Sequence, residues 1–376
     1  MKIGILTQPL HTNYGGLLQN YALQQVLKRL GHNVYTINRN SIPSVYTVPW
    51  NRKFIFWLKQ IIKTCIGRTC SPFFKEFLKI RQHCATFVEK YISVTESFHN
   101  QQELQEIVRK YRFDAYVVGS DQVWRPCYSE NIYNDFLDFC QDVQNVKRIA
   151  YAASFGVNEW EFNKAQTEEC SRLAQIFNAI SVREDSGIDL CEKHFSVDAI
   201  HVLDPTLLLE KEDYIKLVKQ DNQNQIEGEL FCYILDSNDK IENAINKVEK
   251  LLSFKSFQIK AKNDSYRLTS NINEHIIPAP TQWVRAFMDA NMVFTDSFHG
   301  CVFSIIFNKP FWVIGNRERG NARFDSLLKL FNLENRRIDI HDIAHVDLTA
   351  TIDWTSVNTI KEEWQNKSMH FLKNNL

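Results

Sequence analysis

Residues 293–315 read VFTDSFHGCVFSIIFNKPFWVIG, and this stretch predicts the fold more strongly than any other part of the chain. A short apolar run, the turn TDSFHG, a helix-like apolar stretch and a second strand-like run follow one another. This order is the repeating unit of α/β domains with parallel sheets. Such sheets bind ligands beyond the carboxyl ends of their strands, where unpaired helix N–H groups attract anions. The turn therefore places Asp296, Ser297 and His299 at a candidate binding edge.

The same alternation of strand-like and helix-like segments extends over almost the whole chain and predicts an α/β fold. A chain of 376 residues is long for a single core, so we expect two domains. The Asp204-Pro205 pair interrupts the alternation of strands and helices and marks a domain boundary. We therefore expect an N-terminal domain at residues 1–200 and a C-terminal domain at residues 201–376. The C-terminal domain ends in a charged helix. The expected strands are Lys2–Leu6, Asn33–Ile37, Ala115–Val118, Arg148–Ala152 and Ala179–Val182, then Leu230–Leu235, Phe257–Lys260, Met292–Thr295 and Phe311–Ile314.

Composition and charge narrow the class of protein. Lys plus Arg and Asp plus Glu number 44 each, so the net charge gives no indication of nucleic-acid binding. The nine cysteines show no Cys-x-x-Cys or Cys/His metal spacing, so we expect buried thiols and no metal site. The N-terminus lacks the apolar core of a signal peptide, and no run of about 20 apolar residues occurs. We therefore expect a cytoplasmic protein.

Residues 50–81 differ from the rest of the chain in charge. Apolar residues recur there at helical spacing, which is typical of a basic amphipathic helix that lies on an anionic membrane surface. An inserted helix whose apolar face packs on the first domain has the same pattern. The sequence therefore predicts a basic amphipathic insert at residues 50–90 and leaves both roles open. Against one acidic residue, Glu76, the segment holds eight basic ones: Arg52, Lys53, Lys59, Lys63, Arg68, Lys75, Lys79 and Arg81.

Two further turns follow predicted strands and carry candidate site residues. Asn13-Tyr14-Gly15-Gly16 joins the first strand to the first helix, and its glycines let the backbone approach a ligand; a tight turn needs the same residues. Asp121 directly follows a buried strand, where it can act as a base toward a sugar hydroxyl while Trp124 stacks on the ring. Capping of the next element is the alternative reading of Asp121.

Arginines at strand ends indicate an anion site. Arg183 follows a strand, and its planar guanidinium suits a carboxylate or a phosphate. Arg317, Arg319 and Arg323 surround the glycine turn after the last strong strand. An exposed basic loop is often merely solvated, but three arginines at a strand end favour anion binding.

The motifs also occur in a characteristic order. NYGGLLQNYAL begins at residue 13, VGSDQVW at 118, YAASFG at 151, SVRE at 181, DPT at 204 and DSFHG at 296. In this order and spacing, the sequence resembles the polysaccharide pyruvyl transferase family over most of its length. The resemblance implies two Rossmann-like domains facing each other across a cleft, as in the GT-B glycosyltransferases. It also implies transfer of a pyruvyl group from phosphoenolpyruvate to two hydroxyls of a sugar, which forms a cyclic ketal and releases phosphate.

The resemblance further implies that the C-terminal domain holds the donor and the N-terminal domain the acceptor. Some relatives carry Arg-Leu-His-Gly where this chain has Ser297-Phe298-His299-Gly300, so we expect a loop arginine to substitute for the one absent at position 297. The resemblance implies that Arg183 and His299 hold the donor. Together with the residues at the strand ends and turns, we expect the donor to be bound by Arg183, Ser297, His299, Gly300, Arg317, Arg319 and Arg323. We expect the acceptor to be bound by Asn13, Tyr14, Gly15, Gly16, Asp121 and Trp124.

The expected chemistry needs an acid and a base. We assign His299 as the acid or phosphate ligand and Asp121 as the base, with Asp296 as the second choice. No step demands a cofactor or a metal; phosphoenolpyruvate is a co-substrate. The acceptor would be a sugar of a bacterial-type surface polysaccharide, such as an exopolysaccharide or capsule, or of its lipid-diphosphate-linked precursor. A lipid-linked acceptor would suit a peripheral position at the inner face of the membrane through residues 50–81.

Two other functions are compatible with the same fold. One is a GT-B glycosyltransferase that uses a nucleotide sugar, whose diphosphate the basic loop would bind. The other is a non-catalytic sugar-binding protein. The released product distinguishes the glycosyltransferase from a pyruvyl transferase. A glycosyltransferase would release a nucleotide, whereas a pyruvyl transferase would release inorganic phosphate.

Overall fold

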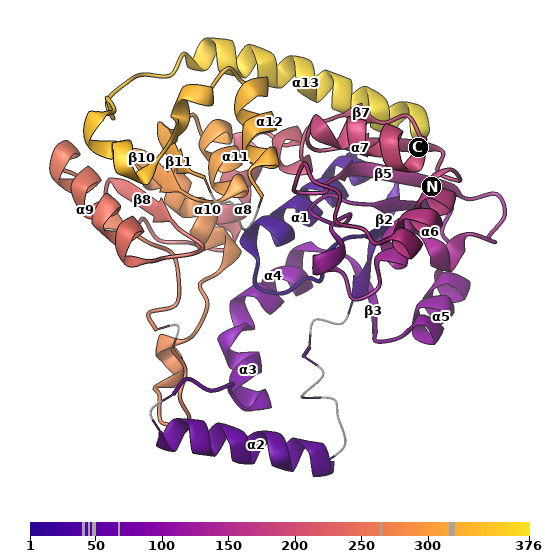
Figure 1. Ribbon diagram of the computed structural model, residues 1–376, viewed down its shortest axis with the longest axis horizontal. Helices are drawn as coiled ribbons and strands as arrows, with labels where there is room; N and C mark the ends of the chain where they lie inside the picture. Colours follow the sequence, from indigo (N-terminus) through magenta and orange to yellow (C-terminus); the bar gives the residue numbers. More distant parts are fainter. Residues whose placement is uncertain (40–41, 44–45, 47–49, 67, 264, 316–319) are drawn as a thin grey trace.

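The apolar runs of the chain form two separate parallel sheets, seen as two neighbouring α/β domains in Figure 1. The computed structural model describes residues 1–39, 42–43, 46, 50–66, 68–263, 265–315 and 320–376. All pairings between named strands are parallel, so each sheet has one edge where the carboxyl ends of its strands meet. In the strand Ala115–Val118, alternate residues enter two different core clusters, which is why the strand is apolar throughout.

The first sheet has seven strands in the order β3-β2-β1-β4-β5-β6-β7. The strand order reverses between β1 and β4, and open α/β sheets form their binding crevice at such a switch point. The strands are β1 (Lys2–Leu6), β2 (Asn33–Arg39), β3 (Val94–Phe98), β4 (Ala115–Val118), β5 (Lys147–Ala153), β6 (Ala179–Val182) and β7 (Ile200–His201). The helices between them include α1 (Tyr14–Arg29), α4 (Gln82–Tyr91), α5 (Gln101–Tyr111), α6 (Lys164–Ala174) and α7 (Ser186–Phe195).

The second sheet has five strands in the order β12-β11-β10-β8-β9. Its central helix α11 follows β10 directly, and all nine of its residues are buried, as expected for a helix that is apolar on every side. The strands are β8 (Leu230–Tyr233), β9 (Ser256–Phe257), β10 (Met292–Thr295), β11 (Phe311–Ile314) and β12 (Arg337–Ile338). The helices are α8 (Lys211–Gln220), α9 (Asp239–Leu252), α10 (Pro280–Asp289), α11 (Phe298–Ile306), α12 (Ala322–Leu330) and α13 (Trp354–Asn375).

The last helix returns to the first domain. In Figure 1, α13 runs across the top of both domains and ends beside β5 and β7. The Ser368 hydroxyl accepts the backbone N–H of Leu203, and the Trp364 ring lies 4.9 Å from the His201 ring. The division expected at residue 200 thus falls inside β7, and the helix assigned to the second domain covers the first. The reason is that the short edge strand β7 must be shielded from solvent, and the apolar side of α13 packs over it.

Helices α2 (Trp50–Cys65) and α3 (Phe74–Ile80) form a projection below the two domains (Figure 1). A segment of the second domain joins it, because Cys70 donates its N–H to Tyr266 and Ile277 donates its N–H to Ile80. The expected insert at residues 50–90 is too long, since α4 belongs to the main core through its buried Cys84 and Phe87. Among the described residues, no helix has the length and apolar character needed to cross a bilayer.

Burial of His201 makes stability depend on pH. Its Nε2 lies 2.9 Å from the Arg183 carbonyl oxygen, and burial lowers the pKa of His201 from 6.5 to about 4. The folded protein therefore keeps this ring neutral, and its contribution to stability is complete above pH 6.5 and lost as the pH falls toward 4.

We expect the free energy of unfolding, measured by urea titration, to fall more steeply between pH 6.5 and 4 in the wild type than in His201→Gln. The difference in slope should reach at most about 1.4 kcal/mol per pH unit, the value for one proton. Glutamine keeps a donor for the Arg183 carbonyl but does not titrate. If the free energy of unfolding fell equally steeply with pH in the wild type and in His201→Gln, the neutral state assigned to the buried His201 ring would be wrong.

Candidate active site between the domains

Five ionisable side chains from both domains gather where the two sheets meet, and we call them the central cluster. Each lies just beyond a strand or in the first turn of a helix that follows one, which is where the carboxyl edges of parallel sheets place ligand-binding groups. All five are buried, with 2–7% of their surface exposed. The members are Asp121 after β4, Arg183 after β6, Asp204 after β7, His299 at the start of α11 and Arg323 at the start of α12.

Arg183 holds the cluster together. Its Nη1 lies 2.9 Å from Oδ2 of Asp204, and its Nη2 lies 3.3 Å from Oδ1 of Asp121. Its guanidinium carbon also lies 4.5 Å from the centre of the Phe298 ring, which comes from the second domain. Burial alone would lower the pKa of Arg183, but the two carboxylates outweigh it and raise the pKa. The guanidinium is therefore permanently charged and paired.

Of the two carboxylates in the central cluster, Asp204 has more hydrogen-bond partners. Its Oδ1 accepts both the N–H and the hydroxyl of Thr206, while Oδ2 faces Arg183 and accepts the Ser120 hydroxyl at 3.2 Å. Burial would raise its pKa, but His299 and Arg183 hold it far below the ordinary value. From the sequence, Asp204 was predicted only to belong to a domain boundary and a family motif. Its position after a short strand-like run was the available signal, since Asp121 and Arg183 were found by that rule.

Asp121 joins the cluster as expected, but its environment makes it a poor base. Burial would raise its pKa, and Arg183, His299 and Arg323 together keep the pKa below the ordinary value. The residue is ionised near neutral pH, and a carboxylate of low pKa is a weak proton acceptor. Its backbone has a φ of 74°, a left-handed conformation that Asp tolerates better than most residues. The geometry thus favours Asp121 as an anchor for Arg183.

His299 is the one member of the cluster with an imidazole ring. Its Nε2 lies 3.7 Å from Oδ2 of Asp204, and no hydrogen-bond partner for Nε2 occurs among the described residues. The first domain packs closely against this ring: a Cβ added to Gly15 would lie only 2.1 Å from Nδ1 of His299. Gly15, predicted to bind the acceptor, is thus found packed against the predicted donor residue.

Arg323 supplies the second arginine of the cluster. Its guanidinium carbon lies 5.6 Å from the centre of the Phe298 ring, so this ring lies near both guanidiniums. Burial and repulsion by Arg183 lower the pKa of Arg323 to about 10, which still leaves it protonated at neutral pH. The other two predicted loop arginines, Arg317 and Arg319, lie outside the described residues.

The turn that begins α11 is built for close packing. Ser297 donates its N–H to the Thr295 hydroxyl at 3.0 Å, and a Cβ on Gly300 would lie 2.3 Å from that hydroxyl oxygen. Asp296 accepts the N–H groups of Leu235 and Asp236 on its two carboxylate oxygens, at 2.7 and 3.1 Å. Asp296 therefore holds the loop after β8, and its expected role as an alternative base is not supported.

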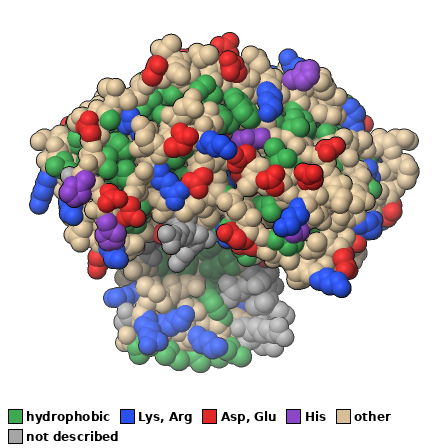
Figure 2. All heavy atoms as spheres, turned by 45° about the horizontal axis from the view of Figure 1, so that its top comes forward, with side chains coloured by type: hydrophobic (Ala, Val, Ile, Leu, Met, Phe, Trp, Pro, Cys, Tyr) green, Lys and Arg blue, Asp and Glu red, His purple; other side chains and the backbone are tan. Residues whose placement is uncertain are grey.

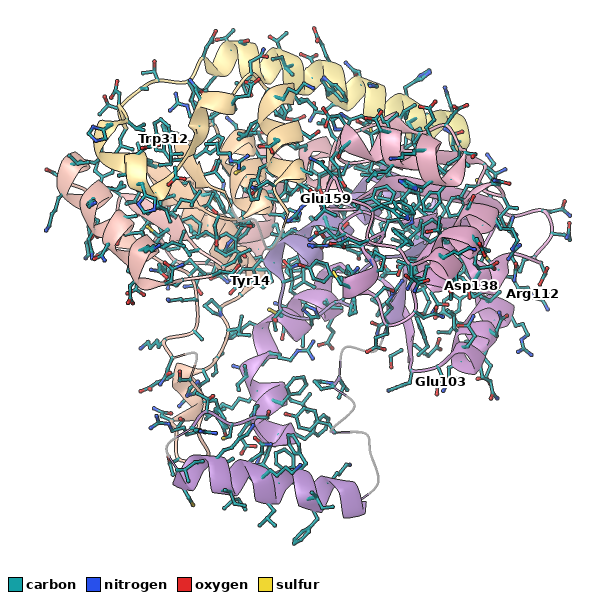
Figure 3. The ribbon with its side chains drawn as sticks, in the orientation of Figure 1. Tyr14, Glu103, Arg112, Asp138, Glu159 and Trp312 are labelled. Carbon is teal, nitrogen blue, oxygen red and sulfur yellow. The ribbon has the colours of Figure 1, made fainter. Side chains whose placement is uncertain are left out.

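Two of the predicted acceptor residues are used for packing instead. The Tyr14 hydroxyl donates to the Pro278 carbonyl across the domain junction, where Figure 3 labels this residue. Trp124 is completely buried, lies parallel to the Phe136 ring at 4.9 Å and donates its indole N–H to the Asp135 carbonyl. The expectation that Trp124 stacks on a sugar is wrong, because large aromatic rings at strand ends also serve the core.

Asn13 and Gly16 form the first turn of α1. The Asn13 side chain accepts the N–H of Gly16 at 3.2 Å and caps the helix. The structural alternative that the sequence left beside ligand binding, a tight turn between strand and helix, therefore accounts for Asn13, which acts as the helix cap.

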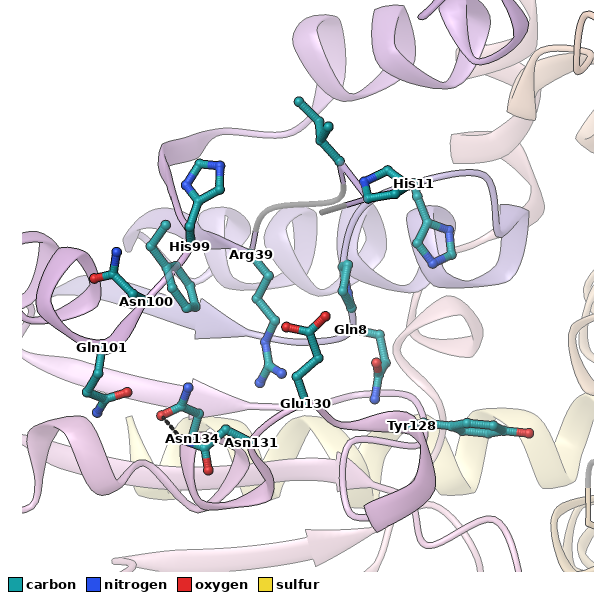
Figure 4. A pocket seen from close by; sticks show the side chains of 14 residues that line it. Gln8, His11, Arg39, His99, Asn100, Gln101, Tyr128, Glu130, Asn131 and Asn134 are labelled. Carbon is teal, nitrogen blue, oxygen red and sulfur yellow. Dashed lines mark hydrogen bonds between the residues drawn. The ribbon is translucent and has the colours of Figure 1, made fainter. Parts of the chain in front are cut away.

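A polar pocket that the sequence did not predict lies beside the cluster. Its volume is about 640 Å³, and it opens at the carboxyl ends of β1, β2 and β3. Gln8, in its wall, donates to the carbonyl of Gln122, the neighbour of Asp121. Figure 4 shows polar side chains from several loops around the cavity. They include Gln8, Arg39, Gln101, Tyr128, Glu130 and Asn134.

The sequence profile of the polysaccharide pyruvyl transferase family matches residues 13–318. The chain belongs to this family. The match confirms the resemblance carried by the motifs and includes the four cluster members Asp121, Arg183, Asp204 and His299. Arg323 lies just beyond it. No protein of curated function matches the sequence.

Solved structures similar to this member of the family confirm its fold. UGT89C1 of Arabidopsis thaliana, complexed with UDP-L-rhamnose, has a TM-score of 0.54 and 8% identity, over 98% of both chains. MnaA of S. aureus, solved with UDP, has a TM-score of 0.52 and 11% identity, over 96% of this chain and 91% of its own. A glycosyltransferase of Rickettsia africae has a TM-score of 0.51 and 10% identity, over 100% and 94%. The pyruvyl transferase fold is thus two Rossmann-like domains in a GT-B-like arrangement.

The contact between Gly15 and His299 generates a matched pair of variants. In Gly15→Ala the new methyl group would collide with the His299 ring, whereas in Gly16→Ala it would meet the Asn13 side chain at an ordinary 3.5 Å. We expect Gly15→Ala to lower the free energy of unfolding by about 1–3 kcal/mol, as overpacking does. Gly16→Ala should be neutral or stabilising, since alanine favours a helix. Urea unfolding measures both, and equal stabilities would refute the contact.

Proposed function

We propose that this protein transfers a pyruvyl group from phosphoenolpyruvate to two hydroxyls of a sugar, in a bacterial-type surface polysaccharide or its lipid-linked precursor. The products would be a cyclic ketal and inorganic phosphate. Membership of the family supports a transferase of polysaccharide biosynthesis. The observation that carries the finer proposal is His299, whose Nε2 has no hydrogen-bond partner among the described residues and lies 3.7 Å from Asp204, the carboxylate that also pairs with Arg183.

The cluster suits a donor with two anionic groups. Phosphoenolpyruvate carries a phosphate and a carboxylate, so its pocket needs cations and N–H donors. Arg323 and the first turn of α11, which has no side-chain cap, offer both on the second domain. Arg183 faces them from the first domain and is positioned by its two carboxylates. No cofactor is needed for this binding mode.

The proposed reaction moves protons through His299. The imidazolium gives its Nε2 proton to the methylene carbon of phosphoenolpyruvate, and the neighbouring carbon becomes oxocarbenium-like. The first sugar hydroxyl attacks that carbon and returns a proton to His299. The second hydroxyl attacks the same carbon, the bond from carbon to the phosphate oxygen breaks, and phosphate leaves with the remaining proton. Such proton transfers by a positioned side chain contribute about 10²–10⁴-fold each.

Phosphate release tests the proposal directly. The wild type is mixed with phosphoenolpyruvate and a panel of galactosides, glucosides and N-acetylmannosaminides, and the acceptor product is weighed by mass spectrometry. We expect acceptor-dependent phosphate and a product heavier by one pyruvyl ketal. His299→Gln should lower kcat at least about 100-fold, since glutamine cannot exchange the proton, while the thermal unfolding midpoint stays close to that of the wild type.

Other outcomes would replace the proposal. Release of a nucleotide from a nucleotide sugar would identify a glycosyltransferase. Sugar binding without turnover of any donor would identify a binding protein. Full activity of His299→Gln would remove the assigned acid even if the reaction itself were found.

We further propose that the acceptor sugar occupies the polar pocket. Sugars are bound by carboxylates, amides and planar cations that pair with hydroxyls, and Glu130, Gln101 and Arg39, which also pairs with Asp135, provide these groups. The pocket adjoins Asp121 through Gln8 and Gln122, so a bound sugar lies next to the central cluster.

Glu130→Gln and Gln101→Ala should therefore raise the acceptor KM about tenfold, the effect of losing one or two hydrogen bonds. The KM for phosphoenolpyruvate should stay unchanged, because neither residue is in the central cluster. Glu363→Gln, on the exposed side of α13, is the matched control. An unchanged acceptor KM in both pocket variants would place the acceptor elsewhere.

A further inference from the structure

Helix α2 carries an exposed apolar stripe on the outside of the projection. Its members recur at the three- and four-residue spacing of one helix face, and a patch of this kind on a protein surface marks an interaction site. We call this set the outer stripe. It consists of Phe54, Ile55, Leu58, Ile61 and Ile62 on α2 and of Ile66, which directly follows the helix; their exposed fractions lie between 46% and 60%.

The opposite face of α2 accounts for how the helix is held. The Trp57 ring lies 4.3 Å from the Phe73 ring, and the Gln60 side chain accepts the N–H of Ser71 at 2.9 Å. Thr64, on the same face, accepts the N–H of Leu268 at 3.5 Å. Packing inside the protein thus uses this inner face and leaves the outer stripe uncovered. An inserted helix that only packs on its own domain does not explain the stripe.

Basic side chains border the stripe. Lys59 and Lys63 are exposed, one helical turn apart, on α2. Lys75 and Lys79 are exposed on the neighbouring α3, beside its half-exposed Leu78. Figure 2 shows apolar and basic side chains together at the lower end of the molecule, with no acidic side chain among them in that view.

We propose that the outer stripe and its lysines dock the protein on an anionic lipid surface. The apolar side chains enter the boundary between headgroups and acyl chains, and the lysines lie among the anionic headgroups. The positive charge of the lysines favours an anionic lipid surface over a second copy of the chain. A second copy of the chain on the same face would bring the lysines of two projections together, whereas anionic lipid neutralises them.

The docking is compatible with the proposed acceptor pocket but does not depend on the proposed function. Ile42 and Pro43, on the connection from β2 to α2, also line the pocket. Vesicle binding is measured without any turnover, so its failure and that of the proposed reaction are separate results.

Sedimentation with vesicles tests the docking. The probes are vesicles of phosphatidylcholine alone and vesicles that also contain phosphatidylglycerol, each at low and raised salt. We expect binding to the anionic vesicles, weakened by salt, and little binding to the neutral ones. The triple variant Ile55→Ser, Leu58→Ser, Ile62→Ser should lose at least about tenfold in partitioning, because less apolar surface can be buried. The double variant Lys59→Glu, Lys63→Glu should lose at least as much.

The controls separate docking from unspecific stickiness. Leu251→Ser removes an equally exposed apolar side chain, 59% exposed, from α9 and should bind like the wild type. All altered side chains are exposed, so thermal unfolding midpoints should be unchanged. Equal binding of the wild type and the α2 variants, or no binding to anionic vesicles, would overturn the proposal. A wild-type dimer that the triple variant converts to a monomer, without vesicle binding, would make the stripe an interface between copies.

Discussion

The buried guanidinium of Arg183 is the constraint around which the candidate site is organised. A charge almost without solvent exposure needs partners, and removing one partner of such a pair typically costs about 3–5 kcal/mol. Arg183 meets this need with Asp121 from the end of β4 and Asp204 from the end of β7. Since these residues lie on loops after three different strands, the ion pairs hold the carboxyl edge of the first sheet in one arrangement. Asp204 in turn lies close to His299 of the second domain.

Close backbone approaches hold the second domain against this edge. A Cβ on Gly15 would collide with the His299 ring, and a Cβ on Gly320 would lie 2.0 Å from the Gly156 carbonyl oxygen. Glycine is therefore required on both sides of the junction for steric reasons. Ser326 adds a hydrogen bond from its hydroxyl oxygen to the Asp185 N–H. The domain junction is thus as closely packed as a core, and this packing sets the position of His299.

In the proposed reaction, the central cluster would hold the donor and the polar pocket would hold the acceptor. The cluster is buried, cationic on the second-domain side and suited to a small anion, whereas the pocket is open, neutral in character and large enough for a sugar ring. Gln8 of the pocket wall is hydrogen-bonded to the carbonyl of Gln122, which follows Asp121 in the chain. The projection adds a third surface. The apolar side chains of its outer stripe and the bordering lysines are exposed and are not packed inside the protein.

The local pattern of the sequence was sufficient for the parallel α/β fold, the family and most of the central cluster. Apolar runs of strand length predict buried strands, and strand ends carry the polar residues, so Asp121, Arg183 and His299 could be found without coordinates. The return of α13 to the first domain, the use of Tyr14 and Trp124 for packing, the partners of Asp204 and the polar pocket depended on the tertiary structure. Each of these features joins residues far apart in the chain, and a residue's own neighbours in sequence carry no information about such contacts. The same holds for α2: its amphipathic pattern was visible, but only packing of the inner face showed which side chains remain exposed.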